Sequence, residues 1–422
     1  MGDQVTSQPV LLHHRLHDAR RDGGTAATRP FTLDSVFTGA ARRCPAAVAV
    51  REEAGRLTYA RANARSTQLA SALVLGGLQL GDPVVVHCDD HRQSVVGQLA
   101  VLRAGGVCVP VRSDLAPAEV ARTALVSGAR VVLCSTSTRS SWPDPGLLIT
   151  LDEPGTWERL AEVRIDPALP RSGPMDAAYL LVDEDGGQLV DHRAWQYVLA
   201  ARMQQIGPAR GPVAVRQAPG GPRTLSAMWW AFASGGALCG RAGDAAAVQA
   251  LGGAAGSVFS PEEYARLLTA AADRPVGAGP GAVVLFGGPC PPELVERHFA
   301  AYRASRLRGE FAPDGSVTPW TAQELSPGGP VGATASGVGT PVPNVHIQVT
   351  EPGGRVLPSG RVGELCATGP ALPFDRIGLP EAGLEAEDFT ESGRGYLHRS
   401  PWLARWRADG TLELVGARPA RA

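Results

Sequence analysis

The chain has 422 residues, with 40 basic and 41 acidic side chains and a formal net charge of −1 at pH 7. Every basic residue is arginine, so the sequence contains no lysine. This excludes a phosphate-loop lysine, a Schiff-base lysine and a lysine that bonds an acyl-adenylate, because arginine is bulkier and cannot act as a nucleophile or base. The near-neutral charge provides no basic field for nucleic acid and no polybasic segment for a membrane, so we expect neither partner.

We expect the chain to lie in the cytoplasm. Its apolar stretches are far too short to span a membrane, and its first residues lack a signal-peptide pattern. Seven cysteines are scattered through the sequence without a C-x-x-C pair, and several lie in apolar runs typical of strands. We interpret all seven as reduced core thiols. They are Cys44, Cys88, Cys108, Cys134, Cys239, Cys290 and Cys366.

Residues 1–29 show no sustained hydrophobic period, and we predict a flexible leader there. Within it, residues 13–18 (HHRLHD) superficially match the H-H-x-x-x-D string of condensation domains, and their histidines suggest a metal site. Only twelve residues precede this string, which leaves no room for a condensation fold upstream, and histidines on a tail are usually solvated. We therefore assign the string no function.

From Phe31 onward, short strands and helices alternate, which predicts parallel sheets covered by helices on both faces. Strands are expected at 84–88, 107–111, 131–134, 178–182, 213–215 and 282–286. Helices are expected just after 57–59 and at 94–104, 117–127, 195–203, 225–234, 261–271 and 292–303.

Glycine and proline crowd the stretch 326–345, and the strands expected beyond it are short and alternating. The predicted fold class is α/β. Two helix-flanked, mostly parallel sheets occupy residues 30–330, and a small β-barrel-like subdomain occupies residues 331–422.

Several short segments follow one another in a recognisable order. The strings at 57–63 (LTYARAN), 102–111 (LRAGGVCVPV) and 285–294 (LFGGPCPPEL) come first, and 338–344 (VGTPVPN), 357–365 (LPSGRVGEL) and 405–416 (RWRADGTLELVG) follow. In that order they resemble the large core subdomain of adenylate-forming enzymes, especially the adenylation domains of nonribosomal peptide synthetases. The resemblance runs from about residue 31 to the C-terminus and implies the fold of that core.

The resemblance places the family's phosphate loop, T-S-G-[ST]-T-G-x-P-K-G, between residues 179 and 192. That loop cradles ATP with backbone amides, hydroxyls and a lysine. This sequence is about five residues shorter there and has Asp183, Glu184 and Asp185 before Gly187. Like charges about 4 Å apart repel by about 1 kcal/mol in water and about 4 kcal/mol at an effective dielectric near 20. Whether these acids repel a phosphate or simply form a solvated turn, we expect no ATP site and no cofactor.

The family's F-D-x-S segment, whose aspartate pairs with the substrate's α-ammonium, corresponds to residues 221–224 (GPRT). Pro222 stands at the aspartate's place, so the resemblance implies no anchor for an α-amino acid. The aspartate of Y-R-T-G-D, which clasps the ribose, corresponds to Trp402, and an indole accepts no hydrogen bond from a sugar.

The family's N-x-Y-G-P-T-E segment corresponds to residues 309–315 (GEFAPDG). Its adenine-framing aromatic survives as Phe311, but the magnesium-binding glutamate has become Gly315. Asp314, one place earlier, would compensate only if a one-residue shift left its carboxylate correctly aimed. The G-R-x-D hinge becomes residues 416–419 (GARP), and we expect the C-terminal lid subdomain, with its catalytic lysine, to be absent.

The leading hypothesis is a catalytically inactive, adenylation-domain-like pseudoenzyme that acts as a scaffold or partner-binding protein in nonribosomal peptide or related secondary-metabolite biosynthesis. Losing one positioned electrostatic contact commonly costs a hundredfold or more in rate, and here five are lost together. The resemblance implies three kinds of partner: an MbtH-like protein, a condensation domain and a carrier-protein module.

Two alternatives stay open. A repurposed enzyme would use the former cleft for non-ATP chemistry on an acyl or aminoacyl carrier-bound intermediate, with acid/base groups drawn from segments that line the family's cleft. These groups are His192, Asp183, Asp185 and Asp314, with Glu184, Glu310 and His398 on the same segments. A thioester-binding sensor would instead use apolar walls, for which the candidates are Pro222, Trp230 and Phe311, with Trp229 and Phe232 beside them.

Overall fold

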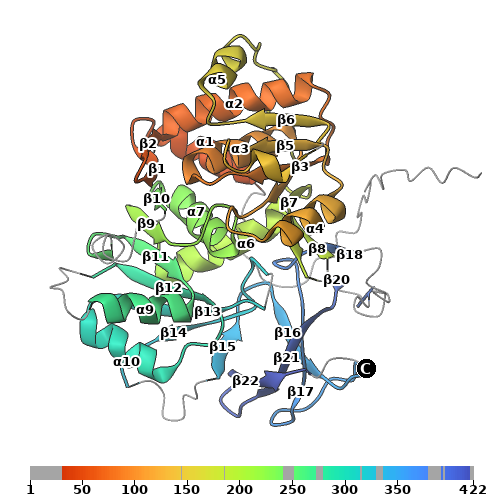
Figure 1. Cartoon of the computed structure of the whole chain (residues 1–422). Helices are drawn as coiled ribbons and strands as arrows, with labels where there is room; N and C mark the ends of the chain where they lie inside the picture. Colours follow the sequence, from red (N-terminus) through yellow and green to blue (C-terminus); the bar gives the residue numbers. More distant parts are fainter. Residues whose placement is uncertain are drawn as a thin grey trace, which may run out of the picture.

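The computed structural model describes residues 31–143, 145–184, 186–240, 251–271, 279–313, 316–328, 336–378, 391–392 and 395–418. The predicted leader at 1–29 lies outside these residues. Two large sheets with helices against them confirm the predicted α/β fold class (Figure 1).

The first sheet has seven strands in the order β18-β8-β7-β4-β3-β5-β6. Its centre is parallel, as the alternation of strands and helices predicts, whereas β8 and β18 add antiparallel strands at one edge. Its strands are β3 (Pro83–His87), β4 (Val107–Pro110), β5 (Val131–Cys134), β6 (Leu147–Thr150), β7 (Ala177–Asp183), β8 (Gly186–Asp191) and β18 (Asp375–Gly378).

The second sheet has thirteen strands in the order β16-β17-β21-β22-β15-β14-β13-β12-β11-β9-β10-β1-β2. The run from β13 to β1 is parallel. These strands are β1 (Val48–Glu52), β2 (Gly55–Thr58), β9 (Pro212–Val215), β10 (Ala237–Cys239), β11 (Gly256–Phe259), β12 (Ala282–Gly287) and β13 (Arg306–Phe311).

The strands that follow β13 are antiparallel and continue the second sheet. β15 pairs with β14 on one side and with β22 on the other, so the predicted barrel is not confirmed as a separate unit within the described residues. These strands are β14 (Thr321–Leu325), β15 (Gly337–Pro341), β16 (His346–Thr350), β17 (Gly363–Thr368), β21 (His398–Trp406) and β22 (Leu412–Ala417). A separate short pair joins β19 (Glu391–Ser392) to β20 (Gly395–Tyr396).

Helices α6 and α7 lie between the two sheets (Figure 1). Helix α7 is buried continuously from Thr224 to Phe232, because its sequence is apolar on every side and Trp229 and Trp230 fill the space next to the strands. The helices are α1 (Leu33–Arg43), α2 (Tyr59–Leu75), α3 (His91–Ala104), α4 (Pro117–Ser127), α5 (Pro154–Ala161), α6 (His192–Ile206), α7 (Pro222–Ser234), α9 (Pro261–Ala271) and α10 (Pro292–Ala301).

Caps decide where several helices begin and end. Helix α3 begins three residues before the prediction, because the carboxylate of Asp90 accepts a hydrogen bond from the backbone N–H of Arg92 at 2.6 Å. It ends at Gly105, whose φ of 82° suits a glycine at a helix C-terminus. Helix α4 begins at Pro117, as predicted, since a proline needs no partner for a backbone N–H at that position.

All seven cysteines are free thiols, as predicted. Five are buried, and Cys44 and Cys239 are half-buried. Burial raises the pKa of both Cys88 and Cys108 well above the ordinary thiol value, which keeps them protonated. Among the described residues, no helix combines the length and the apolar character that a membrane span requires.

The buried guanidinium of Arg103 joins the first three helices. Its Nε donates to the carboxylate of Asp34 on α1 at 2.8 Å. Its terminal nitrogens donate to the Asn63 carbonyl oxygen on α2 at 3.1 Å and to the Thr38 hydroxyl at 3.1 Å. Both charged side chains are at most 5 % exposed, so neither can find water if the other is removed.

We expect Arg103→Met to lower the free energy of unfolding by about 3–5 kcal/mol, because it leaves Asp34 as a buried charge without its partner. Urea denaturation measures the change. The exposed Arg130 provides the matched control, and Arg130→Met should change stability by less than about 0.5 kcal/mol. Equal losses in the two variants would contradict a buried ion pair at Arg103.

Candidate functional site

A tight hairpin occupies the place where the resemblance puts the phosphate loop. Strand β7 ends at Asp183, which pairs directly with Gly186, the first residue of β8. Glu184 is exposed in the turn, and Asp185 lies outside the described residues. Gly187 is buried inside β8, so it contributes to a strand and not to a loop.

The hairpin is closed on its outer side by β18. Strand β8 pairs with β7 along one edge and with β18 along the other. Gly186 has φ +138°, and a Cβ there would lie 2.1 Å from the Ile377 carbonyl oxygen, so β18 approaches as closely as glycine permits. Backbone amides that serve strand pairing on both edges do not converge on a phosphate.

The Asp183 carboxylate is engaged within the same group of strands. It accepts a hydrogen bond from the Gln188 side chain at 2.8 Å and forms an ion pair with Arg376 of β18 at 3.2 Å. The acidic turn predicted from sequence is therefore partly neutralised by a residue far along the chain.

Helix α7 begins where the resemblance expects an anchor for an α-ammonium group. Pro222 is its half-buried first residue, and Arg223 forms an ion pair with Glu263 at 3.1 Å. The Thr224 hydroxyl donates to the Gln217 carbonyl oxygen at 3.0 Å, which fixes the turn before the helix. Pro222 and Arg223 cannot pair with an ammonium ion, and the carboxylate that contacts Arg223, Glu263, is already paired with it.

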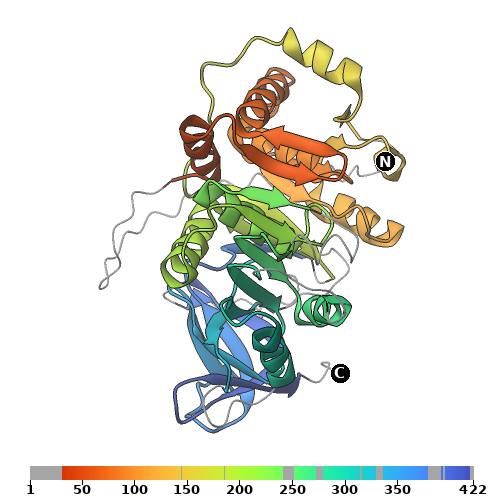
Figure 2. The same cartoon turned by 90° about the vertical axis from the view of Figure 1, so that its left-hand side faces the viewer.

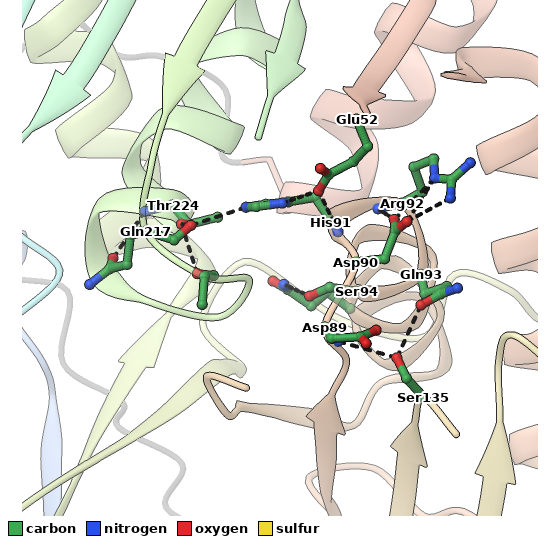
Figure 3. Close-up of polar contacts among 12 residues, drawn as sticks. Glu52, Asp89, Asp90, His91, Arg92, Gln93, Ser94, Ser135, Gln217 and Thr224 are labelled. Atoms are coloured by element: carbon green, nitrogen blue, oxygen red, sulfur yellow. Dashed lines mark hydrogen bonds and ion pairs between the residues drawn. The ribbon is translucent and has the colours of Figure 1, made fainter. Parts of the chain in front are cut away.

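A buried histidine holds the same turn from the opposite sheet (Figure 3). His91 begins α3, and its Nδ1 contacts the carboxylate of Glu52 at the end of β1. Its Nε2 faces the Gln217 carbonyl oxygen at 3.2 Å. Both ring nitrogens of His91 therefore contact oxygen atoms, and the ring links the end of β1 to the turn before α7.

The contacts of His91 with Glu52 and Gln217 were not predicted from the sequence. The available signal was the run Asp89-Asp90-His91 directly after the buried strand β3, since the carboxyl ends of parallel strands commonly carry functional side chains. Asp89 and Asp90 serve local roles. Arg92 pairs with Asp90, and the backbone N–H of Asp89 donates to the Ser135 hydroxyl at 3.2 Å (Figure 3). The Ser137 hydroxyl also donates to the Asp89 carboxylate at 2.6 Å. Nothing in the sequence indicates that Glu52 would meet His91.

Glu310, a candidate acid in the repurposed-enzyme hypothesis, is buried between two arginines. Arg202 Nε and Arg308 Nε donate to one of its carboxylate oxygens at 3.2 and 2.9 Å, and an Arg202 terminal nitrogen contacts the other. Burial by itself would raise the pKa of Glu310, but the two guanidinium groups lower it below the ordinary value. Glu310 is thus an ionised structural group that joins β13 to α6.

The structure brings together two residues that the resemblance assigns to the nucleoside. The ring of Phe311, at the end of β13, lies edge-on to Trp402 of β21, with centroids 6.4 Å apart. Phe311 is only 2 % exposed. Asp314 and Gly315, the candidates for the magnesium position, lie outside the described residues.

The other predicted pocket aromatics are part of the hydrophobic core. Trp229, Trp230 and Phe232 are all at most 1 % exposed. Trp230 donates from its indole N–H to the Gly207 carbonyl oxygen at 3.2 Å, and its ring fills the space beside Gly256. Among the described residues, these aromatics pack in the core and do not line an open pocket. A pocket formed by Trp230, Pro222 and Phe311 therefore stays a prediction.

His192 is buried, and His398 is half-buried. His192 begins α6, and its Nδ1 accepts a hydrogen bond from the Leu33 backbone N–H at 3.0 Å. Burial lowers the pKa of His192 to about 4. Burial likewise lowers the pKa of His398 to about 4, and its Nε2 lies 2.8 Å from the Pro373 carbonyl oxygen. Neutral rings whose nitrogens contact backbone groups are typical of packing roles.

The described site therefore offers little that catalysis or metal binding requires. Each of its three carboxylates already has a partner. Asp183 pairs with Arg376, Glu310 pairs with Arg202 and Arg308, and Glu52 pairs with His91. No group of three or more histidine, cysteine or acidic side chains suited to a metal occurs in the part of the chain that the structure describes.

We expect His192→Gln to reduce the loss of stability on acidification. The folded pKa of His192, about 4, lies below the ordinary 6.5. Stability is therefore full above pH 6.5 and falls as the pH drops toward 4, by about 2 kcal/mol for this group between about pH 7 and pH 5. Urea unfolding at both pH values measures the effect.

The exposed His346 supplies the control, because His346→Gln should leave the pH dependence unchanged. If His192→Gln and the wild-type protein lose the same stability on acidification, the ring is not buried in its neutral form.

Comparison with known proteins supports the correspondence on which these positions rest. A family model described as "AMP-binding enzyme" matches residues 37–182. The phosphinothricin tripeptide synthetase PhsB of Streptomyces viridochromogenes is 30% identical over 408 residues, covering 91% of this chain and 33% of PhsB. Tyrocidine synthase 2 of Brevibacillus parabrevis is 27% identical over 418 residues, covering 93% of this chain and 11% of that protein. The chain thus spans about a third or less of these two relatives.

Solved structures show the same fold. The nonribosomal peptide synthetase FmoA3 in its AMPPNP-bound form aligns with a TM-score of 0.82 and 22% identity, over 92% of this chain and 43% of FmoA3. The adenylation-carrier fusion NpsA-ThdA of Klebsiella oxytoca aligns with a TM-score of 0.78 and 18% identity, over 93% of this chain and 80% of that one. The ordered motifs, the two-sheet architecture and these relatives together show that the chain belongs to the adenylate-forming superfamily, as the core of a nonribosomal peptide synthetase adenylation domain.

Proposed function

We propose that this protein is a catalytically inactive adenylation-domain core that serves nonribosomal peptide biosynthesis in the cytoplasm through contacts with other proteins. The observation that carries the proposal is the closed hairpin at Asp183–Gly186, where β8 is paired on both edges. A triphosphate needs several backbone amides and cations that point toward it. In this hairpin the backbone amides of β8 face the neighbouring strands β7 and β18.

The chemistry around the hairpin supports the same conclusion. Glu184 is exposed at its tip, so an approaching phosphate meets negative charge. The sequence has no lysine for the phosphate loop or for the acyl-adenylate. Pro222 and Trp402 stand where the family holds the substrate's ammonium group and the ribose. Each replacement removes a positioned contact, and losing one such contact typically costs about a hundredfold or more in rate.

The scaffold, in contrast, is intact. Helix α7 and both sheets have well-buried residues, whereas Asp183 ends a strand, Pro222 begins a helix and Trp402 is only half-buried within β21. A chain that keeps its core while its site is replaced is suited to a binding role. Because the relatives are peptide synthetases, we propose partners from the same assembly: a carrier-protein module, a condensation domain or an MbtH-like protein.

A repurposed enzyme is less well supported. His192 is buried with its Nδ1 already bonded, Asp183 is paired with Arg376, and Glu310 is held by two arginines. Asp185 and Asp314 lie outside the described residues. No contact in the described part of the chain joins a candidate acid to a candidate base, so this alternative has no observation in its favour.

We expect calorimetric titration with Mg²⁺ and AMPPNP to give no saturable heat. The core of FmoA3, which has a solved AMPPNP-bound form, is the positive control under the same conditions. A melting curve of each sample ensures that both proteins are folded. Saturable binding at micromolar concentration would contradict the proposal, because it would require a phosphate site that the closed hairpin does not provide.

We expect the protein to form a stable complex with at least one of the three proposed partner types when each is co-expressed with it and purified under native conditions. The control is the FmoA3 core with the same partners, which separates specific pairing from general affinity. Recovery of the protein alone in every combination would count against a role in protein contacts.

A further inference from the structure

One face of the protein carries an excess of positive charge although the whole chain has a net charge of −1. Residues 33–75, which form α1, the β1–β2 hairpin and α2, contain six arginines and three acidic residues. Two of those acids are withdrawn from the surface, since Asp34 pairs with Arg103 and Glu52 pairs with His91. Glu53 is the acid that stays exposed there.

Four of these arginines form what we call the arginine face: Arg51, Arg56, Arg61 and Arg65. Arg51 and Arg56 stand directly opposite each other across the β1–β2 ladder, so their side chains leave the hairpin on the same side. Arg61 and Arg65 lie one turn apart at the start of α2, which follows β2 without a break.

The charges of the arginine face repel one another. The pKa of Arg65 is lowered, first by partial burial and then by the positive charges of Arg61 and Arg92. Arg92 itself lies against Gly55 and donates to the Ala54 carbonyl oxygen at 3.0 Å. None of the four arginines of the face has an ion pair with any described residue. Like charges at opposed strand positions and one helical turn apart destabilise a fold, and only Arg65 has a compensating contact among the described residues, with the Trp157 ring.

The face is also accessible. Arg51, Arg56 and Arg61 are exposed, and Arg65 is half-buried with its guanidinium 4.5 Å from the centre of the Trp157 ring. Strand β2 is the last strand of the second sheet in the described part of the chain, so no further strand covers it there. Figure 2 shows the β1–β2 hairpin lying across the surface turned toward the viewer.

We propose that the arginine face is the docking site for an acidic segment of a partner protein. This inference rests on the proposed function and specifies where the partner binds and by what chemistry. Guanidinium groups pair bidentately with carboxylates, and complementary charge accelerates encounter and fixes orientation. The face is a short patch of four arginines beside the exposed Glu53, which suits a short acidic segment of a protein better than a continuous phosphate backbone.

The test uses the full chain and a fluorescein-labelled poly-glutamate peptide as the probe, with binding followed by anisotropy at low and at physiological ionic strength. We expect binding that weakens with salt. The triple variant Arg51→Glu, Arg56→Glu, Arg61→Glu should weaken binding by about tenfold or more, because it turns attraction into repulsion. The control Arg130→Glu, Arg210→Glu, Arg303→Glu changes the same charge at exposed positions elsewhere and should stay within about twofold of wild type.

A second triple variant distinguishes weaker peptide binding from misfolding. Arg51→Gln, Arg56→Gln, Arg61→Gln removes the repulsion, so its melting temperature should equal or exceed that of the wild type while peptide binding weakens. Equal weakening by the control and face variants would overturn the proposal, as would displacement of the peptide by a duplex DNA oligonucleotide at lower concentration. If AMPPNP does not bind and a partner is recovered, but the face variants retain that partner, the docking site is wrong and the proposed function stands.

Discussion

The burial of α7 between the two sheets is the constraint on which the rest of the architecture depends. Its residues from Thr224 to Phe232 are all buried, so the helix has no side that tolerates water. Large aromatic side chains make it a core element, since Trp229 reaches Tyr179 of the first sheet with an indole hydrogen bond of 3.0 Å and Trp230 packs beside Gly256 of the second. Asp183 and Trp402, which the resemblance assigns to the nucleotide, lie on strands outside this layer, so they can change while the core is kept.

The sequence predicted the elements whose hydrophobic pattern is local. Helix α4 and strand β5 were predicted with the bounds that the structure shows, because proline, glycine and a run of β-branched residues mark their ends. Strands β8 and β18 were missed for a physical reason. The glycines and polar residues of Gly186–Asp191 have no strand preference of their own, and that segment becomes a strand because two partners pair with it.

The sequence motifs predict a position for the candidate site but not the contacts of its residues. Ordered motifs located the segments around Asp183, Pro222, Phe311 and Trp402, and the edge-on contact of Phe311 with Trp402 agrees with their placement in one region. The partners of the charged groups did not follow from the sequence. Glu310 meets Arg202 across 108 positions of the chain, and no periodicity reports a pairing over that separation.

The late pairing of β18 with β8 has a consequence for synthesis of the chain on the ribosome. Arg376 of β18 also contacts Asp183, the last residue of β7, which precedes it by 193 residues. At elongation rates of about 5–20 residues per second, the β7–β8 hairpin emerges about 10–40 s before the strand that covers it. During that interval β8 has an open edge able to accept a foreign strand. The acidic turn gives the nascent hairpin a negative charge at its tip, and such charge discourages association between unfinished copies on neighbouring ribosomes.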